Sequence, residues 1–353
     1  MLGFFMTYSK ALLYTLLSVY LLIFVGAFVR STGAGMGCPD WPKCFDSWIP
    51  PTNSADLPAN YQDVLKEKRV KKSLRVSKTL AALGFTQLSN KVKSHSVGDE
   101  RVEEFRVTKA WIEYVNRLVG VIVGLLVFLA MVLSFKFFKT DKKTVFLNVG
   151  VFVLVGIQGW LGSLVVATNL FPGMITIHMF IALVIALLLI YLYYESITDK
   201  EKKIAVDTTN KKVRLYLIAS IVLLFIQVLL GTNVREQIDV IAKSVLANAR
   251  NQWIAELDIV FYIHRSFSVV IVILQVLILR AIKKEKKFTL FYRIILIAIM
   301  VEIAVGAYMA YFSIPAFLQP IHLLVGLVLV GAQYWVFLNS RSKFVSQLES
   351  PQR

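Results

Sequence analysis

The sequence predicts an all-α polytopic membrane protein, with eight transmembrane helices arranged as two pseudo-twofold-related four-helix bundles. Three observations support this fold class. The chain has 353 residues, of which 57% are hydrophobic and only 17% charged, too apolar for a soluble domain of that size. The hydrophobic residues gather in eight runs that are long enough to cross a bilayer. The last four runs repeat features of the first four.

The eight apolar runs are each close to the ~20 residues that a helix needs to span the hydrocarbon. Their predicted limits are 11–29, 112–135, 144–167, 175–194, 215–233, 259–279, 289–311 and 318–339. The first run resembles a signal peptide, but it is long and no clear cleavage site follows it. We therefore interpret it as a retained helix. An even number of spans puts both termini on one side.

A long polar stretch, residues 31–109, separates the first two runs. It begins with a segment rich in glycine and proline, which predicts a loop. Residues 61–94 are rich in lysine. Two interpretations of them stay open: an amphipathic helix on the membrane surface or a solvated insertion.

Basic residues in the short loops predict the orientation. Three loops carry many of them: Lys136, Lys139, Lys142, Lys143, Lys200, Lys202, Lys203, Lys211, Lys212, Arg214, Arg280, Lys283, Lys284, Lys286 and Lys287. The short loops 168–174 and 312–317 carry none. Cytoplasmic loops hold such an excess, so both termini are predicted to be cytoplasmic. The 31–109 stretch then lies outside, as long translocated loops do regardless of charge.

The formal charge of +17 does not indicate a nucleic-acid partner, because the basic residues follow the loops and no nucleic-acid motif is present. A transporter is also disfavoured. The repeat is parallel, and no span is broken midway by paired glycine or proline.

An internal repeat relates the two halves. Residues 26–30 end the first run as 231–235 end the fifth, and 113–117 open the second run as 261–265 open the sixth. Three further pairs are each 144 residues apart: Gln158 and Glu302, Gly162 and Gly306, His178 and His322.

An offset that is unbroken over two helices is hard to obtain by chance. Because each copy holds four spans, the copies are parallel and related by an axis along the membrane normal. The predicted halves are 1–200, with the outer loop 31–109, and 210–345.

Four special positions lie where outside-to-inside helices begin, and so at one depth: Asn116, His178, His264 and His322. Four arginines lie at the same level: Arg30, Arg117, Arg235 and Arg265. Side chains that are ionisable or bind metals are costly within spans and usually face the bundle interior.

The second half presents two histidines from two helices at that depth, His264 and His322. Neutral imidazole is the usual axial haem ligand, and facing helices of a bundle commonly hold a cofactor. We therefore predict a haem between these histidines. Arg235 or Arg265 would pair with its propionates, or they anchor the membrane edge. His95 lies in the hydrophilic loop and is predicted to be solvated.

The first half has His178 in the place of His322, but Asn116 in the place of His264. Asparagine is a poor haem-iron ligand, so this half would hold a haem through His178 alone, with one face open. Glu113 lies three residues before Asn116, on the same helix face. It is interpreted as a carboxylate that accepts or relays protons, or as a helix-start charge.

The two cysteines, Cys38 and Cys44, lie in a loop predicted to be outside, where disulfides persist. A structural disulfide and a redox-active pair both stay open. The chain has no Cys-x-x-Cys-His, which excludes a c-type haem.

Together these residues resemble the haem A synthase family over nearly the whole chain. The resemblance rests on Gly33-x-Gly35-x-Gly37-Cys38-Pro39-Asp40-Trp41-Pro42-x-Cys44, Trp111-Ile112-Glu113-Tyr114-x-x-Arg117, Gln158-x-x-Leu161-Gly162, His178, His264-Arg265 and His322. It implies a membrane enzyme that oxidises a methyl group of haem O to a formyl group, making haem A for terminal oxidases. It also implies a haem b between His264 and His322, a substrate haem near Glu113 and His178, and the outer-loop cysteine pair at Cys38 and Cys44.

The implied partners are the lipid bilayer of the cell inner membrane, haem O delivered by a haem O synthase, and an unidentified electron acceptor. Homo-oligomerisation stays open. Three features depart from the family. Asn116 replaces the usual histidine, the 236–258 loop lacks a second cysteine pair, and the 45–109 insertion is long. The alternative is a non-catalytic membrane cytochrome b that carries electrons, with a degenerate N-terminal site.

Overall fold

The computed structural model describes residues 7–38, 40–82, 84–98, 104–168, 173–197, 211–242, 244, 249–283 and 290–349. Within these ranges the regular structure is helical, and the only bridge is an isolated one between Cys44 and Ser47. Eight helices are long and apolar enough to cross a membrane. This confirms the predicted all-α polytopic membrane protein.

The helices with membrane-spanning character extend past the predicted apolar runs at most of their ends. They are α1 (Tyr8–Ser31), α4 (Val107–Ser134), α5 (Lys142–Ala167), α6 (Met174–Ser196), α8 (Lys211–Ala242), α9 (Ile259–Lys283), α10 (Leu290–Tyr311) and α11 (Leu318–Glu349). The predictions for residues 198–210 and 284–289, with their lysines, lie outside the described residues.

The helix starts follow from local sequence. The Thr7 side chain caps α1 by accepting from the Lys10 backbone N–H at 3.4 Å. Asp141 caps α5, accepting from the Thr144 hydroxyl at 2.6 Å and from its backbone N–H at 3.2 Å. These hydrogen bonds favour the ionised form and lower the pKa of the Asp141 carboxyl.

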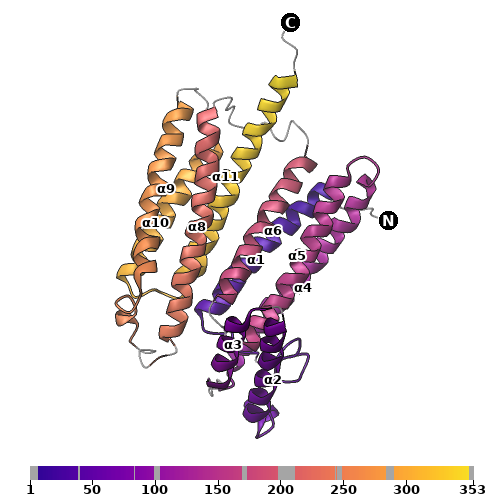
Figure 1. Cartoon of the computed structure of the whole chain (residues 1–353), viewed down its shortest axis with the longest axis vertical. Helices are drawn as coiled ribbons and strands as arrows, with labels where there is room; N and C mark the ends of the chain where they lie inside the picture. The colour runs from indigo at the N-terminus through magenta and orange to yellow at the C-terminus, as the bar shows by residue number, and fades with distance from the viewer. Residues whose placement is uncertain are drawn as a thin grey trace.

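The helices form two groups, shown side by side in Figure 1. In one group α1 packs on α4 and α6, and α5 packs on α4 and α6. In the other, α8 packs on α9 and α11, and α10 packs on α11. The groups meet where α11 contacts α1 and α6, and where α6 contacts α8.

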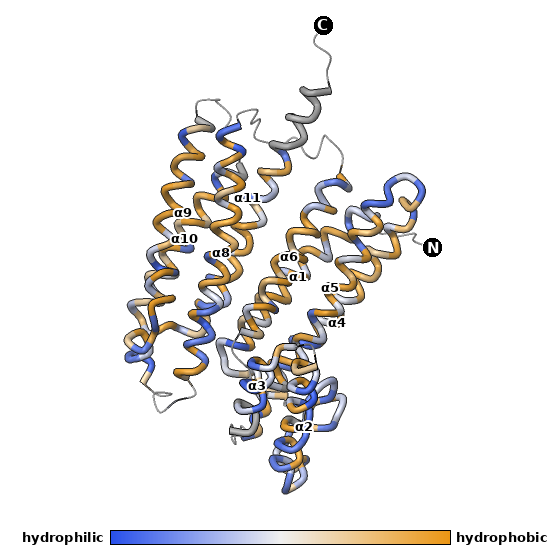
Figure 2. The backbone as a smooth tube through the Cα atoms, viewed as in Figure 1, coloured by the Kyte–Doolittle hydropathy of each residue, from blue (hydrophilic) through white to orange (hydrophobic). Residues whose placement is uncertain are grey.

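The helix surfaces are those of a membrane protein. Large apolar side chains such as Leu125 (64% exposed) and Ile297 (62% exposed) point away from the protein, and the orange colour of Figure 2 runs the length of the spans. Buried polar side chains pair between helices: the Asn148 amide donates to the Tyr8 hydroxyl at 2.7 Å, and the Gln275 amide to the Ser220 hydroxyl at 2.6 Å. Such pairing is what a lipid environment requires.

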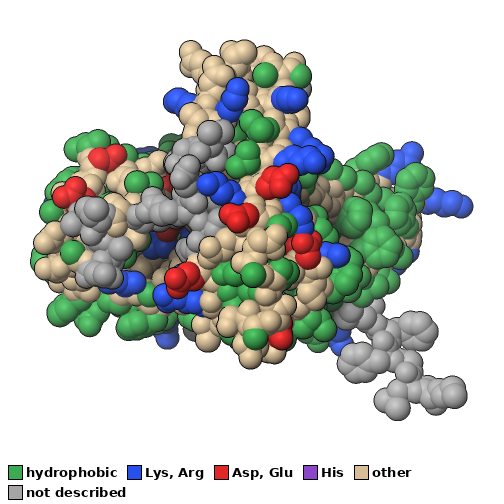
Figure 3. Space-filling model, turned by 90° about the horizontal axis from the view of Figure 1, so that it is seen from below, with side chains coloured by type: hydrophobic (Ala, Val, Ile, Leu, Met, Phe, Trp, Pro, Cys, Tyr) green, Lys and Arg blue, Asp and Glu red, His purple; other side chains and the backbone are tan. Residues whose placement is uncertain are grey.

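The polar stretch between α1 and α4 forms a helical hairpin, α2 (Tyr61–Ala82) and α3 (Thr86–Gly98), below the bundle in Figure 1. Ser77 and Ser89 join its two helices, with their hydroxyl oxygens 2.8 Å apart and both side chains buried. Residues 61–94 thus form two paired helices, and both interpretations of this stretch, a helix on the membrane surface and a solvated insertion, stay predictions. α2 packs on α3, and Figure 3 shows Lys, Arg, Asp and Glu side chains spread over this end.

Partial burial of the hairpin against the bundle perturbs one of its lysines. Burial lowers the pKa of the Lys72 ammonium, and the nearby Arg117 guanidinium lowers it further. The side chain of His95, predicted to be solvated, lies outside the described part of α3.

Candidate functional site

Two imidazoles from different helices of the second half face each other. His264 lies near the start of α9 and His322 near the start of α11, and their ring centres are 6.3 Å apart with planes at 84°. A metal–imidazole nitrogen bond is about 2 Å and the nitrogen lies about 1 Å from the ring centre, so two axial imidazoles hold their centres about 6 Å apart. The observed separation fits a metal held between them.

Glycines on neighbouring helices make room for these rings. A Cβ at Gly231 of α8 would lie 3.0 Å from Cε1 of His264, and a Cβ at Gly306 of α10 would lie 3.4 Å from Cε1 of His322. The first contact is too close for a side chain without a shift of the imidazole. The position of the His264 ring therefore depends on the absence of a side chain at Gly231, whereas Gly306 brings α10 into close contact with the His322 ring.

The first half repeats this arrangement at the matched positions. A Cβ at Gly26 of α1 would lie 3.7 Å from Oδ1 of Asn116, and a Cβ at Gly162 of α5 would lie 3.8 Å from Cε1 of His178. The sequence repeat is thus also a repeat of helix contacts, although Asn116 takes the place of an imidazole.

Polar side chains of adjacent helices approach the three histidines. The Gln158 amide donates to the backbone oxygen of His178 at 2.9 Å, and the Gln227 amide to that of His264 at 2.8 Å. In the third case, Oε2 of Glu302 lies 3.0 Å from Nδ1 of His322.

Buried polar atoms around the histidines lack hydrogen-bond partners. Among the described residues, Nδ1 of His178 and Nδ1 of His264 are buried without one, as is Oδ1 of Asn116. Buried polar groups normally find partners, so these atoms suit a site that receives a bound group. No cluster of three or more His, Cys, Asp or Glu side chains occurs in the described ranges, and a pair of axial ligands does not need one.

The predicted disulfide between Cys38 and Cys44 is confirmed. Glu113, only 3% exposed, holds its loop, because Oε2 accepts from the Cys38 backbone N–H at 2.7 Å and Oε1 pairs with Arg117 at 2.5 Å. Arg117 also donates to three backbone oxygens of this loop, those of Cys38, Asp40 and Lys43. The side chains of Glu113 and Arg117 therefore bind the backbone of the disulfide loop.

The predicted arginine partners of a cofactor lie in different surroundings. Arg235 donates to Asp239 at 2.5 Å, to Gln319 at 2.5 Å and to the backbone oxygen of Arg30. Arg30 in turn donates to Asp239 at 2.7 Å. Arg265 is exposed, over the Tyr262 ring at 5.4 Å.

Residues 234–242, the end of α8, join the two groups of helices. Asp239 binds Arg30 of α1, and Glu236 accepts from the backbone N–H groups of Gly173 and Thr176 at 3.1 Å, which caps the start of α6. We call Arg30, Arg235, Glu236 and Asp239 the clasp. Sequence reasoning missed Glu236, Asp239 and the contact of Glu302, although acidic residues next to or inside an apolar run are a usable signal.

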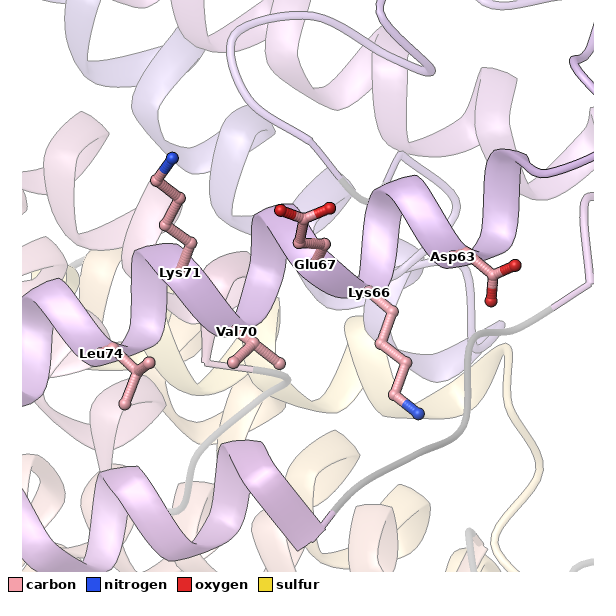
Figure 4. A pocket seen from close by; sticks show the side chains of 6 residues that line it. All are labelled: Asp63, Lys66, Glu67, Val70, Lys71 and Leu74. Carbon is pink, nitrogen blue, oxygen red and sulfur yellow. The ribbon is translucent and has the colours of Figure 1, made fainter.

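A shallow pocket lies on the outer hairpin (Figure 4). Six side chains of α2 line it: Asp63, Lys66, Glu67, Val70, Lys71 and Leu74. None of the predicted site residues lines this pocket, so it is separate from the paired histidines.

The fold and the site define a class: an eight-helix membrane protein, duplicated in sequence, with two facing imidazoles in its second half. The family model COX15-CtaA, described as a cytochrome oxidase assembly protein, matches residues 9–87 and 85–334. The chain therefore belongs to this family, as the sequence motifs predicted.

Individual relatives of this chain carry one shared name. A Shewanella oneidensis protein named "Heme A synthase" is 26% identical over 69% of this chain, and the match spans only 62% of that relative's length. Proteins of the same name from Wolbachia pipientis (23% identical) and Rickettsia prowazekii (22% identical) match 94% and 93% of this chain, and 91% and 96% of their own lengths.

Proposed function

We propose that this chain is a haem A synthase, a membrane oxidoreductase that oxidises a ring methyl of haem O to a formyl group. The observation that carries the proposal is the 6.3 Å separation of the His264 and His322 rings, in a member of the COX15-CtaA family. The names of the three relatives point to the same reaction.

In this proposal the second half holds a haem b, with His264 and His322 as its axial ligands. A haem bound there supplies an iron centre that takes up and releases one electron. The contribution of the protein is to fix both imidazoles, which the contacts at Gly231 and Gly306 support. Arg265, exposed on the helix of His264, stays the candidate to bind a propionate, because Arg235 is engaged in the clasp.

The first half would bind haem O through His178. Asn116 matches His264 in the repeat but offers an amide oxygen, so this side of the site would stay open to a reacting molecule. Glu113 is the proposed proton-handling group. Because both its oxygens are engaged by Cys38 and Arg117, this role requires that the outer loop moves or that Arg117 takes part.

The membrane arrangement completes the proposal. Residues 1–200 form the substrate half and 210–345 the haem b half, in the cell inner membrane. Both termini face the cytoplasm, and the disulfide loop faces outward, where disulfides persist. Haem O would come from a haem O synthase, and an electron acceptor would be needed.

The test is to express the full chain in cells that make haem O but lack a haem A synthase, and to chromatograph the extracted haem. We expect formyl haem with the wild-type chain and none with His178→Ala, provided both are folded in the membrane. Absence of formyl haem from folded wild-type protein would contradict the proposal.

The electron-carrier alternative is not favoured, since the relatives carry the name of a synthase. An electron carrier would hold a stable haem in the second half and yield no formyl product. Its function would also be unchanged by Glu113→Ala.

A further inference from the structure

Glu302 is an acidic side chain inside a membrane-spanning helix, next to a proposed haem ligand. Its Oε2 lies 3.0 Å from Nδ1 of His322, and the two side chains are 18% and 24% exposed. Ionisable groups in such segments are costly and mark functional sites. The presence of Glu302 in a span therefore calls for an explanation, whereas an apolar packing residue there would not.

The repeat shows what changed at this position. Its counterpart Gln158 donates its amide to the backbone oxygen of His178. An ionised carboxylate has no hydrogen to donate, so Glu302 cannot make the matching contact. What lies in reach instead is an imidazole nitrogen, which is a donor in the tautomer that leaves Nε2 free to bind a metal.

A second difference between the halves lies beside the carboxylate. A Cβ at Gly326 of α11 would lie 3.6 Å from Oε2 of Glu302. The residue 144 positions earlier, which matches Gly326 in the repeat, is Ala182. The second half thus combines a carboxylate with a glycine where the first half combines an amide with an alanine.

We propose that Glu302 is a positioning residue for His322, holding its Nδ1–H and keeping Nε2 as the metal-binding nitrogen. The two atoms are within reach but not yet aligned as a formed hydrogen bond, so a rotation of the imidazole completes it. The contact makes His322 a stronger electron donor and favours ferric over ferrous haem. This inference rests on the proposed haem b, and it assigns His322 and His264 unequal roles.

The experiment measures the midpoint potential and the optical spectrum of the purified full-length protein. Outer-shell partners of metal ligands are worth about 10–100-fold in metal affinity. A 10-fold loss of preference for ferric haem equals about 59 mV for one electron. Glu302→Gln should therefore keep a low-spin spectrum and raise the midpoint potential by about that amount or more. The matched control is Gln275→Leu, which removes a buried polar contact to Ser220 in the same half and should leave the potential unchanged.

A haem-containing Glu302→Gln protein with the wild-type potential would overturn the inference and leave the proposed function intact. If Glu302→Gln loses haem, Glu302→Asp decides the matter, because it keeps the negative charge but shortens the side chain and so draws the carboxylate away from Nδ1 of His322. A raised potential in that variant supports the inference, and an unchanged one overturns it. Wild-type protein without any low-spin haem would overturn both the proposed function and this inference.

Discussion

The two halves of the molecule share one set of helix contacts and differ in the side chains placed on it. In each half, a glycine of one helix lies against the special residue of the next helix. The first half has Asn116 and Gln158 where the second has His264 and Glu302. The comparison shows that the two halves share their helix contacts at the glycines. They differ in the side chains that could bind a metal.

The largest expected effect tests the metal-binding difference directly. His264→Ala should abolish the low-spin haem of the second half, because it removes one of two axial ligands. Asn116→Ala, its matched control in the first half, should leave that haem in place. The measurement is the haem-to-protein ratio together with the optical spectrum. Equal haem content in the two variants would show that the halves do not differ as the histidines suggest.

The next effect concerns the clasp that joins the halves. Asp239→Ala would leave Arg30 and Arg235 partly buried without their shared carboxylate, with side chains only 15% and 19% exposed. Removing one partner of a buried pair costs about 3–5 kcal/mol, so the thermal midpoint of unfolding in detergent should fall.

The exposed pair of Lys68, in α2, and Asp46, two residues after Cys44, provides the control. Asp46→Ala should change the free energy of unfolding by no more than about 1 kcal/mol. The role of the clasp would be disproved by equal thermal midpoints for the Asp239→Ala and Asp46→Ala proteins.

A smaller effect is expected from filling the glycine contacts. Gly231→Ala places a Cβ 3.0 Å from His264, whereas Gly26→Ala places one 3.7 Å from Asn116. Overpacking costs about 1–3 kcal/mol, so Gly231→Ala should weaken retention of the second-half haem and Gly26→Ala should not. Haem release on dilution measures the difference, and identical release rates would argue against the steric role of Gly231.

The smallest effect is a pH dependence in the first half. Because the folded-state pKa of Asp141 is lowered, its contribution is present above its unfolded pKa of about 3.9 and is lost as pH falls through the folded value. Asp141→Ala should cost about 0.5–2 kcal/mol at neutral pH, and the difference should shrink in acid.

Thr7→Ala is the matched control, since the Thr7 cap of α1 does not titrate. Its cost in unfolding free energy should stay constant over the same pH range. A cost of Asp141→Ala that does not change with pH would mean that the carboxylate does not act through its charge.

Much of the fold could be predicted from the sequence, because apolar runs and a fixed offset are one-dimensional signals. The eight spans follow from the apolar runs, and the matched positions of His178 and His322 follow from the offset. The end of α8 was not predicted to continue to Ala242, since residues 234–242 are polar and lie beyond the apolar run. Contacts with helices that are distant in the sequence stabilise this extension, and such contacts cannot be predicted from the local sequence.

The candidate site divides in the same way. The approach of His264 and His322 was predicted, because matched helix starts lie at one depth. The prediction for Glu113 lacked its contact with the outer loop. Its spacing to Asn116 indicated a shared helix face, but the structure turns its carboxylate to the backbone of Cys38, 75 residues away. A contact between a loop and a helix of such separation depends on the fold of the whole outer segment.

The length of α8 has one more consequence. Its 32 residues make a rod of about 48 Å, whereas the hydrocarbon layer is about 30 Å thick. The last turns of α8 carry Glu236 and Asp239, which contact the neighbouring half. Sliding of one half past the other would therefore uncap α6, the helix of His178, so the spacing between the two histidine sites depends on ionic contacts that the protein largely shields from water.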